Sequence, residues 1–106
     1  MGLLDFIFGP DIQTGIEEYQ KNEGAVLLDV RTASEYAQGH IPGGQNIPLQ
    51  ELNRIKNIIT DKETRIFTYC HSGTRSGMAE VVLKRMGYPH VVNIGGISSY
   101  SGPLEK

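Results

Sequence analysis

The sequence predicts one α/β domain, a three-layer α/β/α sandwich whose small parallel sheet has about five strands. A chain of 106 residues has the length of a single domain. Apolar residues make up 39% of it, with 13 glycines and 5 prolines, which is typical of a packed fold rich in turns. Short apolar runs alternate with helical patterns, and parallel strands require such crossovers. We expect residues 10–106 to form the domain and residues 1–9 to form a separate apolar segment.

The first helix and the first strand are predicted near the N-terminus. Thr14 and Glu17 have the spacing of a capping box, and Gly24 favours a helix end, which predicts a helix near 14–22. The run Ala-Val-Leu-Leu-Asp-Val at 25–30 is short, continuous and rich in apolar residues. Such a run predicts a strand that is buried on both faces.

A second helix and a turn-rich stretch follow this strand. Thr32 and Glu35 repeat the capping-box spacing and predict a short helix near 33–38 that ends before a glycine. The stretch 40–48 contains two prolines and two glycines. We expect it to be mostly turn, with a brief strand at 45–47.

The second half of the chain continues the alternation. Apolar residues three and four positions apart predict a helix within 49–59. An alternating strand at 65–69 comes directly before Cys70, and a further helix from Ser76 leads to a last strand at 91–94. Because ligands of open parallel sheets bind beyond the carboxyl ends of the strands, the position of Cys70 is that of a functional residue.

Composition excludes several classes of protein. The formal charge is −2 and no stretch clusters lysine and arginine, so we expect no nucleic-acid partner. A single cysteine excludes an intrachain disulfide and multi-thiolate metal sites, and it fits a reducing, cytoplasmic location. Histidines at 40, 71 and 90 are scattered, so we expect no metal.

We expect no membrane span from the apolar residues near the N-terminus. The run is far shorter than the about 20 residues that cross a bilayer, it has no basic flank and it contains Asp5. We expect these side chains to pack on the domain or on a partner chain, with a weak membrane-surface anchor as the alternative.

The segment 69–76, Tyr-Cys-His-Ser-Gly-Thr-Arg-Ser, carries the chemistry of this sequence. Cys70 faces a helix N-terminus, where the macrodipole and free amides favour thiolate over thiol. Gly73 permits a positive φ, so the loop amides can turn inward and bind an anion. Arg75 supplies a cation that either meets an oxyanion or braces the loop on a carboxylate. We expect Cys70 to be a nucleophile whose sulfur is charged and open to water; the alternative is a buried structural cysteine.

The rest of this loop is expected to contact the substrate. Backbone amides should matter more than side chains, and the expected side-chain role of His71 is a solvated surface position. Ser76 is either a helix cap or a substrate contact. The expected substrate-binding residues are His71, Ser72, Gly73, Thr74, Arg75 and Ser76.

Several motifs in the correct order resemble the rhodanese-like domains, as a single-domain sulfurtransferase. They are Leu-Asp-Val-Arg at 28–31, Glu-Tyr at 35–36, Gly-His-Ile-Pro-Gly at 39–43, Asn-Ile-Pro at 46–48, the cysteine loop at 69–76 and Gly-Gly-Ile at 95–97. Two positions depart from the family pattern. Gly44 stands where alanine is usual, and Tyr100 is the nearest aromatic residue where the family commonly has tryptophan.

The resemblance implies a persulfide mechanism. Cys70 would accept a sulfane sulfur from a small anionic donor such as thiosulfate, with no metal or organic cofactor. Since the chain has no second cysteine, the sulfur would pass to cyanide, an external thiol or an acceptor protein. Four further positions match the family, and we expect them to brace the site: Asp29, Arg31, Glu35 and His40.

Two other functions use a similar loop. A non-catalytic sulfur carrier or redox sensor would also expose a reactive thiolate. The loop also resembles that of a phosphatase or arsenate reductase. That family places five residues between the cysteine and the arginine, whereas four residues separate Cys70 from Arg75. The shorter loop favours sulfur transfer.

Overall fold

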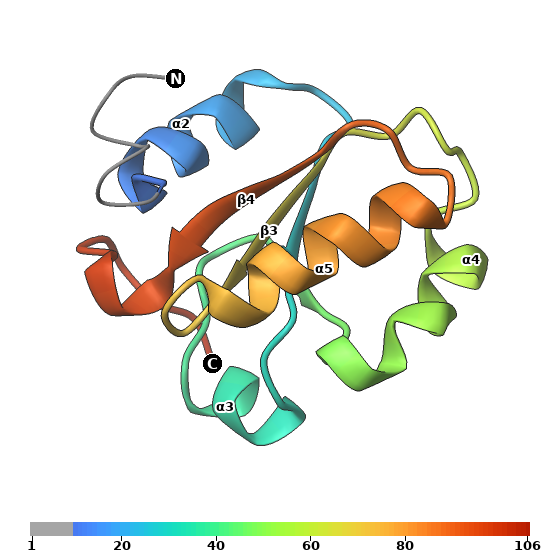
Figure 1. Cartoon of the computed structure of the whole chain (residues 1–106). Helices are drawn as coiled ribbons and strands as arrows, with labels where there is room; N and C mark the ends of the chain where they lie inside the picture. Colours follow the sequence, from blue (N-terminus) through green and yellow to red (C-terminus); the bar gives the residue numbers. More distant parts are fainter. Residues whose placement is uncertain (1–9) are drawn as a thin grey trace.

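The structure is a computed structural model that describes residues 10–106, so the expected apolar segment at 1–9 lies outside the described residues. Four parallel strands form one sheet in the order β2-β1-β3-β4 (Figure 1). The strands are β1 (Val26–Asp29), β2 (Gly44–Asn46), β3 (Ile66–Cys70) and β4 (Val91–Gly96). The predicted fold class is confirmed. The expected number of about five strands was too high, because no other described segment pairs with an edge of this sheet.

Helices cover both faces of the sheet, which gives the three layers (Figure 1). The α-helices are α2 (Ile12–Lys21), α3 (Ala33–Gln38), α4 (Ile55–Ile58) and α5 (Thr74–Arg85), and the 3-10 helices are η1 (Leu49–Arg54) and η2 (Ile97–Ser99). None of the helices in the described range is long and apolar enough to cross a membrane.

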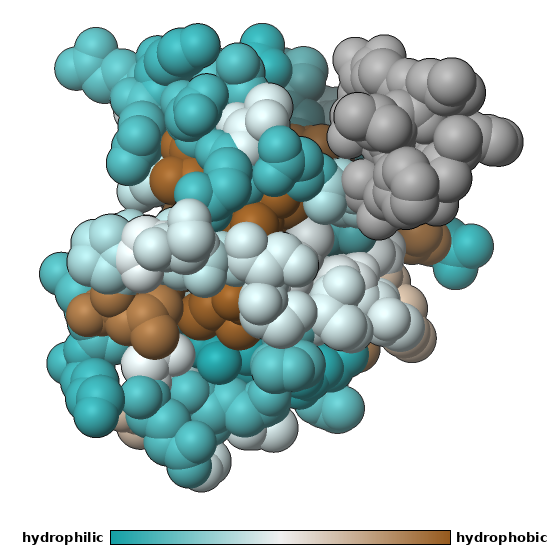
Figure 2. Space-filling model, turned by 90° about the vertical axis from the view of Figure 1, so that its left-hand side faces the viewer, coloured by the Kyte–Doolittle hydropathy of each residue, from teal (hydrophilic) through white to brown (hydrophobic). Residues whose placement is uncertain are grey.

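Alternation along the strands divides the core into two clusters. On one face Leu27, Phe67 and Tyr69 pack with residues of α2. On the other face Leu28 and Cys70 join residues of α4 and α5. Cys70 therefore points into the layer that contains α5. On the side of the molecule shown in Figure 2, hydrophilic residues predominate and hydrophobic residues show between them.

The predicted cap of the first helix is wrong. Asp11 is the N-cap, and its carboxylate accepts a hydrogen bond from the amide of Gln13 at 3.1 Å. The Thr14 hydroxyl donates to that same carboxylate at 2.9 Å, so it does not cap the helix itself. Because the Asp11 carboxylate satisfies the free amide of Gln13, the helix begins at Ile12.

The predicted capping box of α3 is confirmed. The Thr32 hydroxyl accepts from the Glu35 amide at 3.1 Å, and the Glu35 carboxylate accepts from the Thr32 amide at 3.0 Å. The helix expected within 49–59 is instead a 3-10 turn, η1, followed by the single-turn α4. Capping thus fixes where Glu35 lies, beside the carboxyl end of β1.

Candidate active site

Cys70 is the last residue of β3, and a three-residue loop joins it to α5. Gly73 in this loop has φ +104°, a conformation that favours glycine, and it directly precedes the first residue of α5. The helix therefore starts at Thr74, two residues before the expected Ser76. On the other side of the loop, a Cβ atom at Gly96 would overlap the backbone of His71 and Ser72. The two glycines let the loop curl tightly against the end of β4.

Two donors are directed at the sulfur of Cys70. The Gly73 amide donates to Sγ at 3.0 Å, and the Ser76 hydroxyl lies 3.4 Å from Sγ. Burial raises the pKa of the Cys70 thiol, whereas hydrogen bonds from the Ser76 hydroxyl and from the amides of Ser76, Gly73 and Ser72 lower it. The net result is a pKa below the ordinary value for cysteine.

The expectation that this sulfur is open to water is wrong. Cys70 is 0% exposed and belongs to the same apolar cluster as Ala79 and Leu83 of α5. The reason lies in the sheet: β3 is a central strand, and strand alternation turns its last side chain into the α5 layer. Backbone donors and a hydroxyl, not solvent, therefore favour the thiolate.

Arg75 braces the loop on a carboxylate. Its Nη1 and Nη2 atoms donate to Oε1 and Oε2 of Glu35 at 2.7 and 3.0 Å. Both side chains are about one-third exposed. The hydrogen bond from Arg75 lowers the pKa of Glu35 to about 2; burial opposes this shift, and the cap contacts with Thr32 add to it. The guanidinium charge is thus matched by a carboxylate forty positions away in the sequence.

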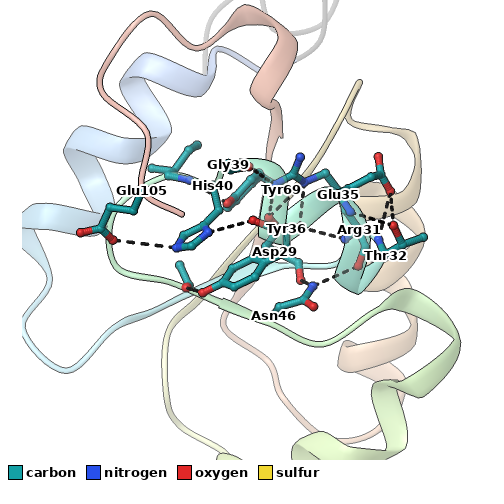
Figure 3. A network of polar contacts seen from close by, with 12 residues as sticks. Asp29, Arg31, Thr32, Glu35, Tyr36, Gly39, His40, Asn46, Tyr69 and Glu105 are labelled. Atoms are coloured by element: carbon teal, nitrogen blue, oxygen red, sulfur yellow. Dashed lines mark hydrogen bonds and ion pairs between the residues drawn. The ribbon is translucent and has the colours of Figure 1, made fainter.

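A buried ion pair lies at the end of β1, the neighbouring strand (Figure 3). Arg31 donates to Asp29 through Nη2 at 2.7 Å and through Nε at 3.0 Å, and Nη2 also donates to the Gly39 carbonyl at 2.8 Å. The Asn46 side chain donates to the carbonyls of Asp29 and Arg31 at 3.0 Å each. These bonds tie the end of β1 to β2 and to the end of α3.

His40 holds the C-terminal segment rather than the cysteine loop. Its ring stacks on Tyr36 with 3.7 Å between centroids, and Nδ1 lies 3.0 Å from the Tyr36 carbonyl oxygen (Figure 3). Two backbone hydrogen bonds of 2.8 Å join His40 to Glu105. No hydrogen bond in the described chain links His40 directly to the loop, so any bracing by this residue acts through its neighbours.

The side chains of the loop lie mostly outward. His71, Ser72 and Thr74 are exposed, and the Ser72 hydroxyl lies 3.4 Å from that of Thr74. His71 borders a cavity of about 350 Å³ whose other walls include Glu35 and Leu104. This cavity adjoins the cysteine loop through His71.

Asn93 of β4 is the residue that the sequence interpretation missed. Its Oδ1 accepts from the Ser76 hydroxyl at 2.7 Å and from the Gly95 amide at 2.9 Å, while Nδ2 donates to the Gly73 carbonyl at 3.1 Å. Ser76 is buried inside α5 and is not a cap. Its single hydroxyl proton has three acceptors within reach: Oδ1 of Asn93 at 2.7 Å, Sγ of Cys70 at 3.4 Å and the Gly95 carbonyl at 3.4 Å. An asparagine inside the apolar run 91–94 was the signal that could have identified it.

The described residues contain no group of three or more histidine, cysteine, aspartate or glutamate side chains placed to hold a metal ion.

Comparison with known proteins places this chain in a family. The profile of the Rhodanese-like domain matches residues 14–102. Thiosulfate sulfurtransferase PspE of Escherichia coli (strain K12) is 41% identical over 80 residues, which cover 74% of this chain and 77% of that protein. The putative sulfur carrier protein YrkF of Bacillus subtilis (strain 168) is 36% identical over 90 residues, covering 84% of this chain but 48% of that protein. A solved structure, described as rhodanese with anions from E. coli, has a TM-score of 0.72 at 40% identity and covers 77% of this chain and 98% of its own.

Proposed function

The chain belongs to the rhodanese-like domain family, and we propose that it is a sulfurtransferase that carries sulfur as a persulfide on Cys70. The observation that supports this most strongly is the set of donors around Sγ, with the Gly73 amide at 3.0 Å and the Ser76 hydroxyl at 3.4 Å. The match to a thiosulfate sulfurtransferase supports the same chemistry.

The first half of the proposed reaction loads the sulfur. The Cys70 thiolate attacks the outer sulfur of thiosulfate, the sulfur–sulfur bond of the donor breaks, and sulfite leaves with the electron pair. Cys70 then carries a persulfide anion. Fixed loop dipoles near Sγ stabilise this negative charge without reorganising during the reaction.

The second half unloads the sulfur to an external acceptor. Cyanide or a thiolate attacks the outer sulfur of the persulfide, and Cys70 leaves as a thiolate. The products are thiocyanate or a new persulfide. Because Cys70 is the sole cysteine, no resolving thiol of this chain competes with the external acceptor.

A donor reaches Sγ only when the loop shifts, since Cys70 is fully buried. The exposed loop residues His71 and Ser72 are the ones whose movement opens a path. The amide of Ser98 donates to the His71 carbonyl at 3.1 Å, so η2 holds this side of the loop closed. We expect loading to depend on how readily that contact opens.

The two alternatives are less well supported. Arg75 is engaged by Glu35 on both of its terminal nitrogens, so it is not free to bind a phosphoryl or arsenate oxygen. A redox sensor needs the same access to the buried Cys70 sulfur as a sulfurtransferase, and neither relative described above is named as a sensor. A sulfur carrier remains the second candidate, because the YrkF relative is named as one.

The experiment that tests the proposal is a thiosulfate:cyanide assay combined with intact-mass measurement. We expect thiocyanate formation, and a mass gain of one sulfur after thiosulfate alone. Cys70→Ser should lose both signals. Met78→Ser, which removes an exposed sulfur from α5, should keep both. A mass gain without thiocyanate would favour a carrier, and no mass gain with any sulfane donor would overturn the proposal.

A further inference from the structure

The cavity beside the cysteine loop offers little charge to a ligand. His71 reaches it from the loop, Ile97 and Leu104 form an apolar wall, and Gln38 and Ser98 add uncharged polar groups. A donor that docks in this cavity, next to the loop that covers Sγ, meets mostly apolar and neutral groups.

Both guanidinium groups near the cavity are already matched by carboxylates. Arg31 lines the cavity but binds Asp29 at 2.7 Å, with its side chain only 6% exposed. Arg75 forms two hydrogen bonds with Glu35, and Glu35 itself lines the cavity. Among the cavity-lining residues that the structure describes, no lysine or arginine is left without an acidic partner.

Thiosulfate is poorly matched to such a cavity. A dianion that leaves water needs fixed positive charge in return, and two neutral ion pairs supply little of it. The Gly73 amide is directed at Sγ and not at the cavity, so it stabilises the persulfide product rather than the sulfonate end of the donor. An organic persulfide carries at most one negative charge and has an apolar body that suits Ile97 and Leu104.

We propose that this site selects sulfane donors of low charge, the persulfides of organic thiols, over thiosulfate. This inference rests on the proposed function, because it requires that Cys70 accepts sulfur. The Cys70 thiolate attacks the outer sulfur of R–S–SH, the sulfur–sulfur bond of the donor breaks, and the departing thiolate takes the proton. Cys70 is left with the persulfide anion, and no oxidant or reductant is consumed.

The Glu35–Arg75 pair provides the decisive variant. Glu35→Gln removes the matching negative charge but retains the capping box of α3, because glutamine can accept the same Thr32 amide. The freed charge on Arg75 should then attract thiosulfate. We expect the ratio of kcat/KM for thiosulfate to kcat/KM for the persulfide of 2-mercaptoethanol to rise about tenfold. A ratio cancels any change in the intrinsic reactivity of Cys70.

Glu51→Gln is the matched control. Glu51 accepts from Arg54 at 2.8 Å on an exposed surface, so this variant makes the same change in net charge away from the cavity. We expect its ratio to equal that of the unmodified protein. In the unmodified protein, added KCl should leave the thiosulfate kcat/KM nearly unchanged, and in Glu35→Gln it should lower it.

The outcomes separate the two proposals. An unchanged ratio in Glu35→Gln, or an equal rise in Glu51→Gln, would overturn the donor preference while Cys70 still loads sulfur. A steep fall of the thiosulfate rate with KCl in the unmodified protein would overturn it as well, whether or not Glu35→Gln folds. Failure of both donors to load Cys70 would instead refute the proposed function.

Discussion

The carboxyl ends of the neighbouring strands β1 and β3 both hold buried polar groups, but these groups are arranged differently. At the end of β1, Asp29 and Arg31 neutralise each other and share their remaining bonds with backbone and with Asn46. At the end of β3, the contacts that the structure describes at the Cys70 sulfur are a hydrogen bond from the Gly73 amide and the Ser76 hydroxyl at 3.4 Å. The end of β1 thus holds a buried ion pair, whereas the end of β3 directs uncharged hydrogen-bond donors at a single sulfur.

The difference shows how rigidity and reactivity are divided within a small domain. Buried ion pairs hold their geometry because breaking one leaves an uncompensated charge. Backbone amides carry no net charge. They stabilise a thiolate or persulfide by hydrogen bonds and do not lock it in an ion pair. The β1 end thus serves as the frame, and Glu35 connects that frame to the loop through Arg75.

The largest effect is expected at the frame. Asp29→Ala leaves the Arg31 guanidinium buried without its partner, and it should lower the free energy of unfolding by about 3–5 kcal/mol. Urea denaturation measures this loss. The exposed pair offers the control, since Glu51→Ala should cost about 1 kcal/mol or less. Equal losses of unfolding free energy in Asp29→Ala and Glu51→Ala would show that the Asp29–Arg31 pair is not the main stabilising contact at the end of β1.

Asn93→Ala tests whether the loop depends on the strand behind it. The variant removes the partner of the Gly73 carbonyl and of the Gly95 amide, both close to Cys70. We expect a loss of about 1–3 kcal/mol in the free energy of unfolding. Asn22→Ala, which removes an exposed hydrogen bond to the Glu18 carbonyl, should cost clearly less. A negligible loss at Asn93 would mean that the loop holds its shape alone.

Ser76→Ala tests the donors at the sulfur with little effect on the frame. Without the hydroxyl, burial is opposed only by the amides, so the pKa of Cys70 should rise. Thiolate absorbance followed against pH gives this value. Ser72→Ala is the comparison, because its hydroxyl lies near Thr74 and not near Sγ. An unchanged pKa of Cys70 in Ser76→Ala would show that the Ser76 hydroxyl does not stabilise the thiolate.

The smallest effect concerns the link between the two regions. The pKa of Glu35 is lower in the folded chain, so its contribution is complete above its ordinary value of 4.5 and is lost as the pH falls toward about 2. Since the pair is about one-third exposed, we expect less than about 1 kcal/mol. Acid titration of the unfolding free energy should be flatter in Glu35→Gln. Identical slopes of unfolding free energy against pH in the two proteins would show that the Glu35–Arg75 pair does not contribute to stability.

Local signals predicted part of this architecture. The spacing of Thr32 and Glu35 identified α3, and the loop after a strand identified the position of Cys70. Long-range pairing could not be predicted, because nothing in the sequence links Asn93 to a loop twenty positions away. The burial of Cys70 was missed for a similar reason. It depends on β3 being central, which only the assembled sheet decides.

The central claim is that hydrogen-bond donors outweigh burial and lower the pKa of the Cys70 thiol. The most direct test is the pKa of this single thiol, measured by ultraviolet titration with Cys70→Ser as the blank. We predict a midpoint below that of an unperturbed cysteine thiol titrated in the same way. A midpoint at or above that value would show that burial dominates and would contradict this claim.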